Sequence, residues 1–312
     1  MVISNTKSYS YSEQVKRHKL EDIDYSTFDP KDKISRDNAV ILSSAAAITY
    51  TSPEFQAEFF KNQAAVKKFE FLDSKNNAAR GVCAPDTGTQ VSLIETDDAL
   101  IVASRGTPLE LSDNPDTNLQ TQDLINDLNA WPTKNYDGSA LVHSGFKNAA
   151  DGIWGQLKPH LEEAEAAGKS LHFVGHSLGA AISTHLCDRL FQEMHALPTS
   201  LVTIGGPAVG WGDELAHLES IGLAGRTTRF VNNIDPVVGA VPLGAQIGTQ
   251  VYFGADGKAQ VGDGWRVGDR LEGLKQAAIG FELNPLQDHY PVVYHDLIAR
   301  PDNAEVLSGL EH

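Results

Sequence analysis

Residues 171–182 have the sequence LHFVGHSLGAAI, and this stretch decides the fold class. The apolar run at 171–174 leads directly into GHSLG at 175–179, and an amphipathic helical pattern follows. Strand, tight turn and helix in direct succession are the setting of a nucleophile elbow, which exposes a serine, here Ser177, at the tip of the turn. The flanking glycines avoid clashes with the neighbouring strand and helix, and the helix dipole favours negative charge at the serine oxygen. The alternative interpretation is a glycine-rich turn with a capping serine.

Strands and helices alternate along the rest of the chain. Apolar residues recur in steps of four behind the turn, which predicts a helix with one face on a sheet. They are Leu178, Ile182, Leu186, Leu190 and Met194. Further strands are predicted at 90–95, 99–103, 201–204 and 227–231, and further helices at 37–62, from 143 to Gly168, and at 290–297. This alternation predicts a mostly parallel sheet covered by helices on both faces, and the elbow makes it an α/β-hydrolase fold.

The 312 residues allow one large α/β domain or two small ones. Residues 1–36 are polar and poorly periodic, and we interpret them as an N-terminal arm or extension. Residues 37–312 are predicted to form the α/β-hydrolase domain. Because the polar start has no apolar run behind its basic residues, it does not resemble a Sec-type signal peptide. A cytoplasmic chain, a chain exported by a leaderless route and a mature chain whose leader was removed all fit this pattern.

Composition weighs against several classes of protein. The net charge of −16 disfavours nucleic acid and strongly anionic membranes as partners. No stretch approaches the roughly 18 to 20 consecutive apolar residues of a membrane-spanning helix. Cys83 and Cys187 are the only cysteines and form neither a disulfide framework nor a zinc site; Cys187 falls in a helical pattern and is expected to be buried. The oligomeric state stays open.

A serine hydroxyl becomes a good nucleophile only when a base removes its proton, so a histidine and an orienting acid are expected after the elbow, in the order Ser, acid, His. Asp235 ends the strand predicted at 227–231 and precedes a proline, which places it at the carboxyl edge of the sheet. Asp188 and Asp213 compete in position, but their patterns indicate a helix-surface and a helix-start residue. We therefore predict Asp235 as the acid.

Chain order removes most histidines from consideration. Only His289, His295 and His312 follow Asp235. His289 lies in Asp288-His289-Tyr290, where a loop gives way to a helical pattern, whereas His295 falls within that helix. We predict His289 as the base, and we interpret the histidines at 143, 172 and 176 as packed structural residues.

Taken together, these residues resemble the class 3 lipases, the family that includes the secreted fungal triacylglycerol lipases. The matching pieces are SRGT at 104–107, VHSGF at 142–146, GHSLG at 175–179, GGP at 205–207, the acid loop at 231–242 and DH at 288–289. The resemblance runs from about residue 37 to 300. Several motifs in the right order are far more specific than any one of them.

The resemblance implies two further site residues. In the family, the residue after the Arg-Gly pair and the residue after the nucleophile donate to the oxyanion, which assigns that role to Thr107 and Leu178. The chain also departs from the family: Ser104 stands where an aromatic or bulky apolar residue is usual, AVGW at 208–211 replaces the common RVGN, and the fungal disulfides are absent. These departures leave Ser177, Asp235 and His289 in place.

We therefore expect a serine carboxyl-ester hydrolase, specifically a triacylglycerol lipase that acts through an acyl-enzyme on lipid or other ester substrates at an oil–water interface. This chemistry requires no metal or cofactor. A phospholipase A1 or a feruloyl-type esterase on the same fold is the alternative. A non-catalytic lipase-like binding protein is less favoured, because such proteins usually lose a residue of the triad or elbow.

The resemblance also implies a mobile lid at residues 107–131, just after the oxyanion strand. The stretch at 113–116 is polar, and an apolar face follows, formed by Leu124, Ile125, Leu128 and Trp131. The alternative is an ordinary amphipathic helix packed permanently on the sheet.

Overall fold

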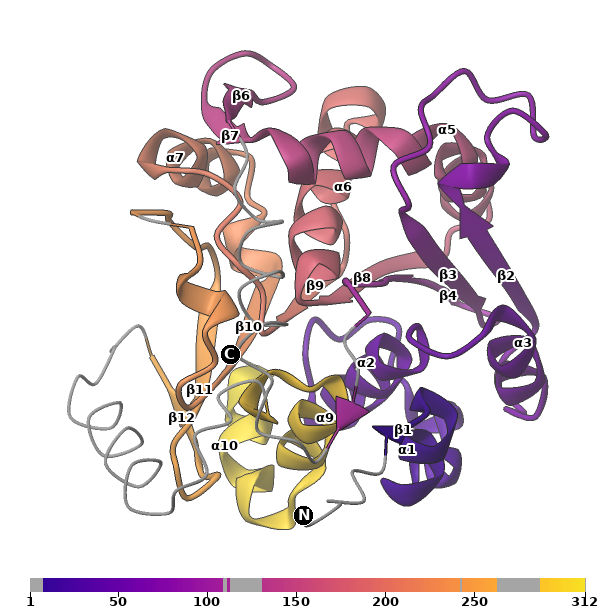
Figure 1. The fold of residues 1–312 in the computed structure, drawn as a ribbon, viewed down its shortest axis with the longest axis vertical. Coiled ribbons are helices and arrows are strands. Elements are labelled where there is room, and N and C mark those ends of the chain that lie inside the picture. Colours follow the sequence, from indigo (N-terminus) through magenta and orange to yellow (C-terminus); the bar gives the residue numbers. More distant parts are fainter. Residues whose placement is uncertain (1–7, 109–110, 113–130, 242, 263–286, 312) are drawn as a thin grey trace, which may run out of the picture.

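The computed structural model describes residues 8–108, 111–112, 131–241, 243–262 and 287–311. Its centre is an eight-stranded sheet with the order β12-β11-β10-β9-β8-β4-β3-β2 (Figure 1). The strands are β2 Lys68–Asp73, β3 Gln90–Glu95, β4 Ala99–Ser104, β8 Ser170–His176, β9 Ser200–Ile204, β10 Thr227–Asn232, β11 Thr249–Phe253 and β12 Ala259–Val261. Five neighbouring strands of the sheet are parallel to one another, namely β4, β8, β9, β10 and β11. Strands β2, β3 and β12 are antiparallel to their neighbours. This is the predicted α/β-hydrolase fold.

Helices cover both faces of the sheet. In Figure 1, α5 (Ser144–Ala166) and α6 (Leu178–Met194) lie above it, and α2 (Arg36–Ile48) lies below it with α9 (Pro291–Ala299) packed on α2. The central strands are apolar because both of their faces are buried; every residue of β4 is buried. The other elements are α1 Tyr11–Arg17, α3 Pro53–Lys61, α7 Gly212–Ser220, α10 Ala304–Ser308, β1 Ser8–Tyr9, β5 Leu111–Ser112, β6 Pro132–Lys134, β7 Leu141–His143 and short 3-10 turns.

The single helix predicted at 37–62 was wrong in extent, because the chain forms two helices there. The first ends at Ile48, and the second begins at Pro53. Proline suits the first turn of a helix but disrupts a helix interior, and the Ser52 side chain caps the new helix by accepting from the Phe55 N–H. Strand β2, at the edge of the sheet, is an element that the sequence did not predict.

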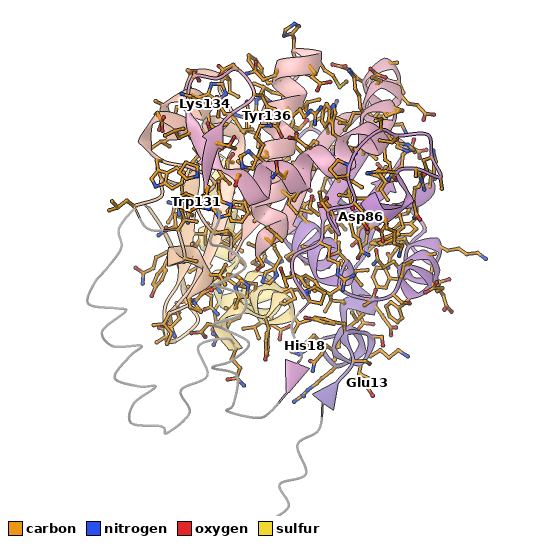
Figure 2. The ribbon with its side chains drawn as sticks, turned by 45° about the horizontal axis from the view of Figure 1, so that its top comes forward. Glu13, His18, Asp86, Trp131, Lys134 and Tyr136 are labelled. Atoms are coloured by element: carbon orange, nitrogen blue, oxygen red, sulfur yellow. The ribbon has the colours of Figure 1, made fainter. Side chains whose placement is uncertain are left out.

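The N-terminal segment packs against the rest of the molecule. The side chains of Val15, Leu20 and Tyr25 are at most 1% exposed and belong to the same apolar core as the sheet and its helices. Strand β1 pairs antiparallel with β5, whose two residues lie within the segment 107–131 that was predicted as a lid. Figure 2 shows Glu13 of α1 and His18, the residue directly after α1, at the opposite end of the molecule from Lys134 and Tyr136, which belong to the region of the β6–β7 hairpin. The boundary proposed at residue 36 stays a prediction.

No helix within the part of the chain that the structure describes is long and apolar enough to cross a membrane.

Candidate active site

The turn at Ser177 has the geometry that the sequence predicts for an elbow. Ser177 joins β8 to α6 with φ 59° and ψ −131°, a conformation that costs a residue with a side chain about 1–3 kcal/mol. A Cβ atom on Gly175 would lie 2.1 Å from the Gly179 carbonyl oxygen, and one on Gly179 would lie 2.2 Å from the Ser104 carbonyl oxygen. Only glycine therefore fits at both positions, and the turn holds the serine at the carboxyl edge of the sheet.

The structure brings Ser177, Asp235 and His289 together. His289 Nδ1 lies 2.8 Å from Asp235 Oδ2, and His289 Nε2 lies 2.8 Å from Ser177 Oγ. Because the carboxylate accepts, Nδ1 carries the imidazole hydrogen and Nε2 presents its lone pair to the serine hydroxyl. All three residues are at most 1% exposed. This is the arrangement in which a histidine removes a serine proton while an aspartate orients the ring.

The Asp235 carboxylate receives two more hydrogen bonds. The Val237 N–H donates to Oδ1 over 2.9 Å, and the Tyr294 hydroxyl donates to Oδ2 over 2.7 Å. Tyr294 also accepts from the Asn232 N–H over 2.9 Å, and burial raises the pKa of Tyr294 well above its usual value, so the hydroxyl keeps its proton. Gly205, with φ 55°, makes room for this arrangement, because a Cβ there would lie 2.8 Å from Asp235 Oδ2. Tyr294 was not among the predicted site residues, and its only signal in the sequence is its place in the helix after His289.

Asp288 joins the loop of the predicted base to the loop of the predicted acid. Its carboxylate accepts from the Asn233 side-chain amide over 3.0 Å and from the Ile234 N–H over 3.4 Å. Its backbone carbonyl accepts from the Asn232 side-chain amide over 3.0 Å. Burial raises the pKa of Asp288 to about 6. The residue beside His289 thus ties the two loops together.

The two predicted oxyanion residues belong to chain segments that adjoin the elbow. Leu178 begins α6 directly after Ser177, where the first N–H groups of a helix lack partners within the helix. A Cβ on Gly106 would lie 2.5 Å from the His176 carbonyl oxygen and 3.0 Å from Ser177 Cβ, so the chain that leads into Thr107 lies against the elbow. The donor roles of Thr107 and Leu178 stay predictions.

The competing residues lie outside this arrangement. His295 is 2% exposed, and its Nδ1 lies 2.9 Å from Ser43 Oγ in the contact between α9 and α2. Asp213 is in the first turn of α7, as predicted. The interpretation of Asp188 as a helix-surface residue was wrong: it is fully buried, and the cost of burying its carboxylate is offset by its contact with His217 Nε2 at 2.8 Å.

Most of the predicted lid lies outside the described residues, since 109–110 and 113–130 are not among them. Trp131, labelled in Figure 2, is 85% exposed.

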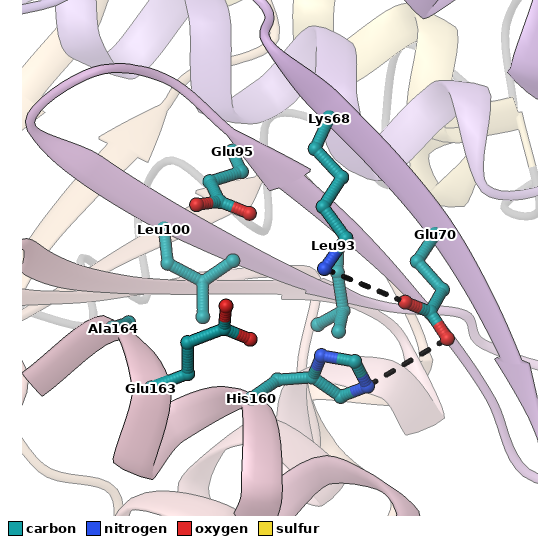
Figure 3. A pocket seen from close by; sticks show the side chains of 8 residues that line it. All are labelled: Lys68, Glu70, Leu93, Glu95, Leu100, His160, Glu163 and Ala164. Atoms are coloured by element: carbon teal, nitrogen blue, oxygen red, sulfur yellow. Dashed lines mark ion pairs between the residues drawn. The ribbon is translucent and has the colours of Figure 1, made fainter. Parts of the chain in front are cut away.

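The pocket in Figure 3 is remote from Ser177. Its lining includes Leu100, near the opposite end of β4 from Ser104, and Glu70, which faces Lys68 and His160 at 4.0 and 3.6 Å. Its volume of about 10 Å³ holds at most one water molecule. It is therefore no substrate pocket.

The fold and the family comparison together define the class of protein as a carboxylic ester hydrolase with an α/β-hydrolase fold. Residues 103–244 match the model of the family described as Lipase (class 3). This span contains Thr107, Ser177, Leu178 and Asp235, and the match confirms the predicted resemblance. The activity of this class of protein, and of this chain, is lipase-type ester hydrolysis.

Several solved structures share the fold. The Rhizomucor miehei lipase–propeptide complex has a TM-score of 0.52 and 16% identity, covering 84% of this chain and 75% of that chain. Lipase II from Rhizopus niveus has a TM-score of 0.53 and 16% identity, covering 83% of this chain and 88% of that chain. A triacylglycerol lipase described as having a serine protease triad at its catalytic centre has a TM-score of 0.50 and 16% identity, covering 80% of this chain and 83% of that chain. Among curated proteins there was no match.

Proposed function

We propose that the protein hydrolyses triacylglycerols through an acyl-enzyme formed on Ser177. The observation that carries the proposal is the hydrogen-bonded series Ser177–His289–Asp235, with 2.8 Å at each step. The solved triacylglycerol lipase whose fold it shares is described as having a serine protease triad, which supports the same chemistry here.

The mechanism follows from these contacts. Ser177 Oγ attacks the ester carbonyl carbon while His289 Nε2 takes its proton, and Asp235 stabilises the imidazolium that forms. The N–H groups of Thr107 and Leu178 donate to the tetrahedral oxyanion. The oxyanion collapses, the carbon–oxygen bond to the alcohol breaks, and His289 gives the proton to the departing alcohol. His289 then activates a water molecule, which releases the fatty acid and restores Ser177.

Charge favours an uncharged lipid as the substrate. With a net charge of −16, the protein is repelled by a strongly anionic lipid surface, whereas a triacylglycerol droplet carries no charge of its own. Triacylglycerols are therefore favoured over anionic phospholipids as the substrate.

A fluorophosphonate probe and a substrate panel test the proposal. The wild type should be labelled on Ser177 and should hydrolyse emulsified triacylglycerol faster than phosphatidylcholine or a feruloyl ester. Ser177→Ala should abolish labelling and lower turnover by several orders of magnitude. Ser220→Ala is the control, since Ser220 Oγ donates to the His217 carbonyl oxygen on the distant helix α7. Retained activity in Ser177→Ala, or labelling at another serine, would exclude the mechanism, and a preference for another ester would exclude the substrate.

A further inference from the structure

A second hydrogen-bonded series ends at the backbone of His289, whereas Asp235 contacts its side chain. The Tyr50 hydroxyl lies 2.7 Å from His176 Nδ1, and His176 Nε2 lies 2.6 Å from the backbone carbonyl oxygen of His289. Tyr50 is 4% exposed and His176 is 1% exposed. His176 precedes the serine in the elbow, so this series connects the nucleophile's turn to the backbone of the proposed base.

The chemistry of the partners fixes the direction of each hydrogen bond. The His289 carbonyl oxygen can only accept, so His176 Nε2 must carry a hydrogen. Burial lowers the pKa of His176 well below its usual value, so the ring is neutral and Nδ1 carries no hydrogen. Burial also raises the pKa of Tyr50 well above its usual value, which keeps the phenol protonated. Tyr50 therefore donates to His176, and His176 donates to His289.

The other tautomer of His176 does not fit this geometry. With the hydrogen on Nδ1, the lone pair of Nε2 would face the lone pairs of the His289 carbonyl oxygen across 2.6 Å. The two atoms would separate and carry the His289 backbone with them. The ring of His289 contacts both Ser177 and Asp235 at 2.8 Å, and a displacement of its backbone disturbs both contacts.

We propose that Tyr50 is a positioning residue for ester hydrolysis: its hydroxyl holds His176 in the Nε2–H tautomer, and that tautomer holds the backbone of His289 in register with Ser177. The assignment of His289 as the base rests on the proposed function; the tautomer of His176 does not.

Neighbouring residues keep water from replacing the Tyr50 hydroxyl. The ring of Tyr11, from α1, stacks on the ring of Tyr50 with centroids 5.0 Å apart. A Cβ on Gly106 would lie 2.2 Å from the Tyr50 hydroxyl oxygen, so the chain before Thr107 closes the other side. The N-terminal segment thus packs directly on the residue that orients His176.

Tyr50→Phe tests the proposal against a matched control. Tyr25→Phe removes an equally buried hydroxyl, which lies 2.9 Å from Ser44 Oγ and belongs to the core away from the site. We expect Tyr50→Phe to lower kcat for a soluble ester by 10- to 100-fold with KM changed less than twofold, and Tyr25→Phe to leave both unchanged. Equal kcat in wild type and Tyr50→Phe would overturn the proposal.

His176→Gln supplies a second test, because an amide has no tautomers. Glutamine can offer an N–H toward His289 and an oxygen toward Tyr50. In this background, adding Tyr50→Phe should lower kcat by less than threefold. A further loss as large as in the wild-type background would show that Tyr50 acts without the His176 tautomer, contrary to the proposal.

Imidazole ¹⁵N spectroscopy of the full-length wild type reads the tautomer directly and does not depend on activity or on any variant folding. The proposal requires the Nε2–H form of His176, and an Nδ1–H form would overturn it. Failure of the fluorophosphonate to label Ser177 would instead overturn the proposed function, and the spectrum would still report on His176.

Discussion

Replacing Tyr294 by phenylalanine removes one oxygen atom that serves two buried partners. The hydroxyl donates to Asp235 Oδ2 and accepts from the Asn232 N–H, and Asn232 is only 3% exposed. A hydrogen bond to a charged group contributes about 1.5–3 kcal/mol, and a buried N–H left without its partner costs about 1–3 kcal/mol. The free energy of unfolding should therefore fall by roughly 2.5–6 kcal/mol.

Turnover should fall as well, because Asp235 Oδ2 also accepts from His289 Nδ1. Without the tyrosine, the Val237 N–H on the other oxygen is the one contact described above, besides His289 itself, that fixes the rotation of the carboxylate. A loss of about 1.4–2.7 kcal/mol in orientation of the imidazole corresponds to about a 10- to 100-fold lower kcat.

Urea unfolding followed by fluorescence gives the stability, and initial rates on a soluble short-chain ester give kcat and KM. Tyr25→Phe is the control, since its hydroxyl contacts only the neutral Ser44 among the partners that the structure gives it; it should lose about 1 kcal/mol of stability and keep its kcat. If Tyr294→Phe loses stability but keeps the wild-type kcat, the hydroxyl supports β10 and does not orient Asp235. If neither quantity changes, both hydrogen bonds are absent in solution.

Three further predictions concern other parts of the site and its surroundings. His289→Ala should abolish hydrolysis, whereas His295→Ala should lower the melting temperature and leave the turnover of the folded protein unchanged. A fully active His289→Ala would refute the assignment of His289 as the base. Thr107→Val should lower kcat by about 10²–10³ with KM unchanged if the hydroxyl is an oxyanion donor, and a higher KM at unchanged kcat would indicate a binding role instead. Burial raises the pKa of Glu214 from 4.5 to about 8, so between these values the folded protein keeps a proton that the unfolded chain has released, and stability falls as pH rises. Glu214→Gln should therefore match the wild type near pH 4 and be more stable by a few kcal/mol at pH 8.5 in thermal unfolding; an equal difference at both pH values would show that the carboxyl does not titrate in this range.

The elements that could be predicted from the sequence are those with a local signature. The glycines at 175 and 179 mark the elbow because a side chain there would collide with backbone, and the steps of four behind it mark α6. Chain order then selected Asp235 and His289 among many acids and histidines, and the structure places both beside Ser177.

The rest could not be predicted because it depends on contacts between distant positions. Tyr50 and His176 are 126 residues apart, and Tyr294 and Asp235 are 59 apart; neither pair leaves a periodic signal. In the N-terminal segment, Leu20 and Tyr25 begin short 3-10 helices, and a single turn is too short to show the spacing of an amphipathic helix. The burial of Leu20 and Tyr25 could therefore not be predicted from the spacing of apolar residues.

In the proposed mechanism, the separation in sequence between the nucleophile and the base has a consequence during synthesis. His289 follows Ser177 by 112 residues, so a ribosome that adds about 5–20 residues per second makes the base roughly 6–22 seconds after the serine. During that interval the elbow can fold with its strand and helix, but its serine hydroxyl has no partner to remove its proton. In the proposed mechanism, hydrolysis can begin only when the chain around His289 folds beside Ser177, with the following helix α9 packed on α2.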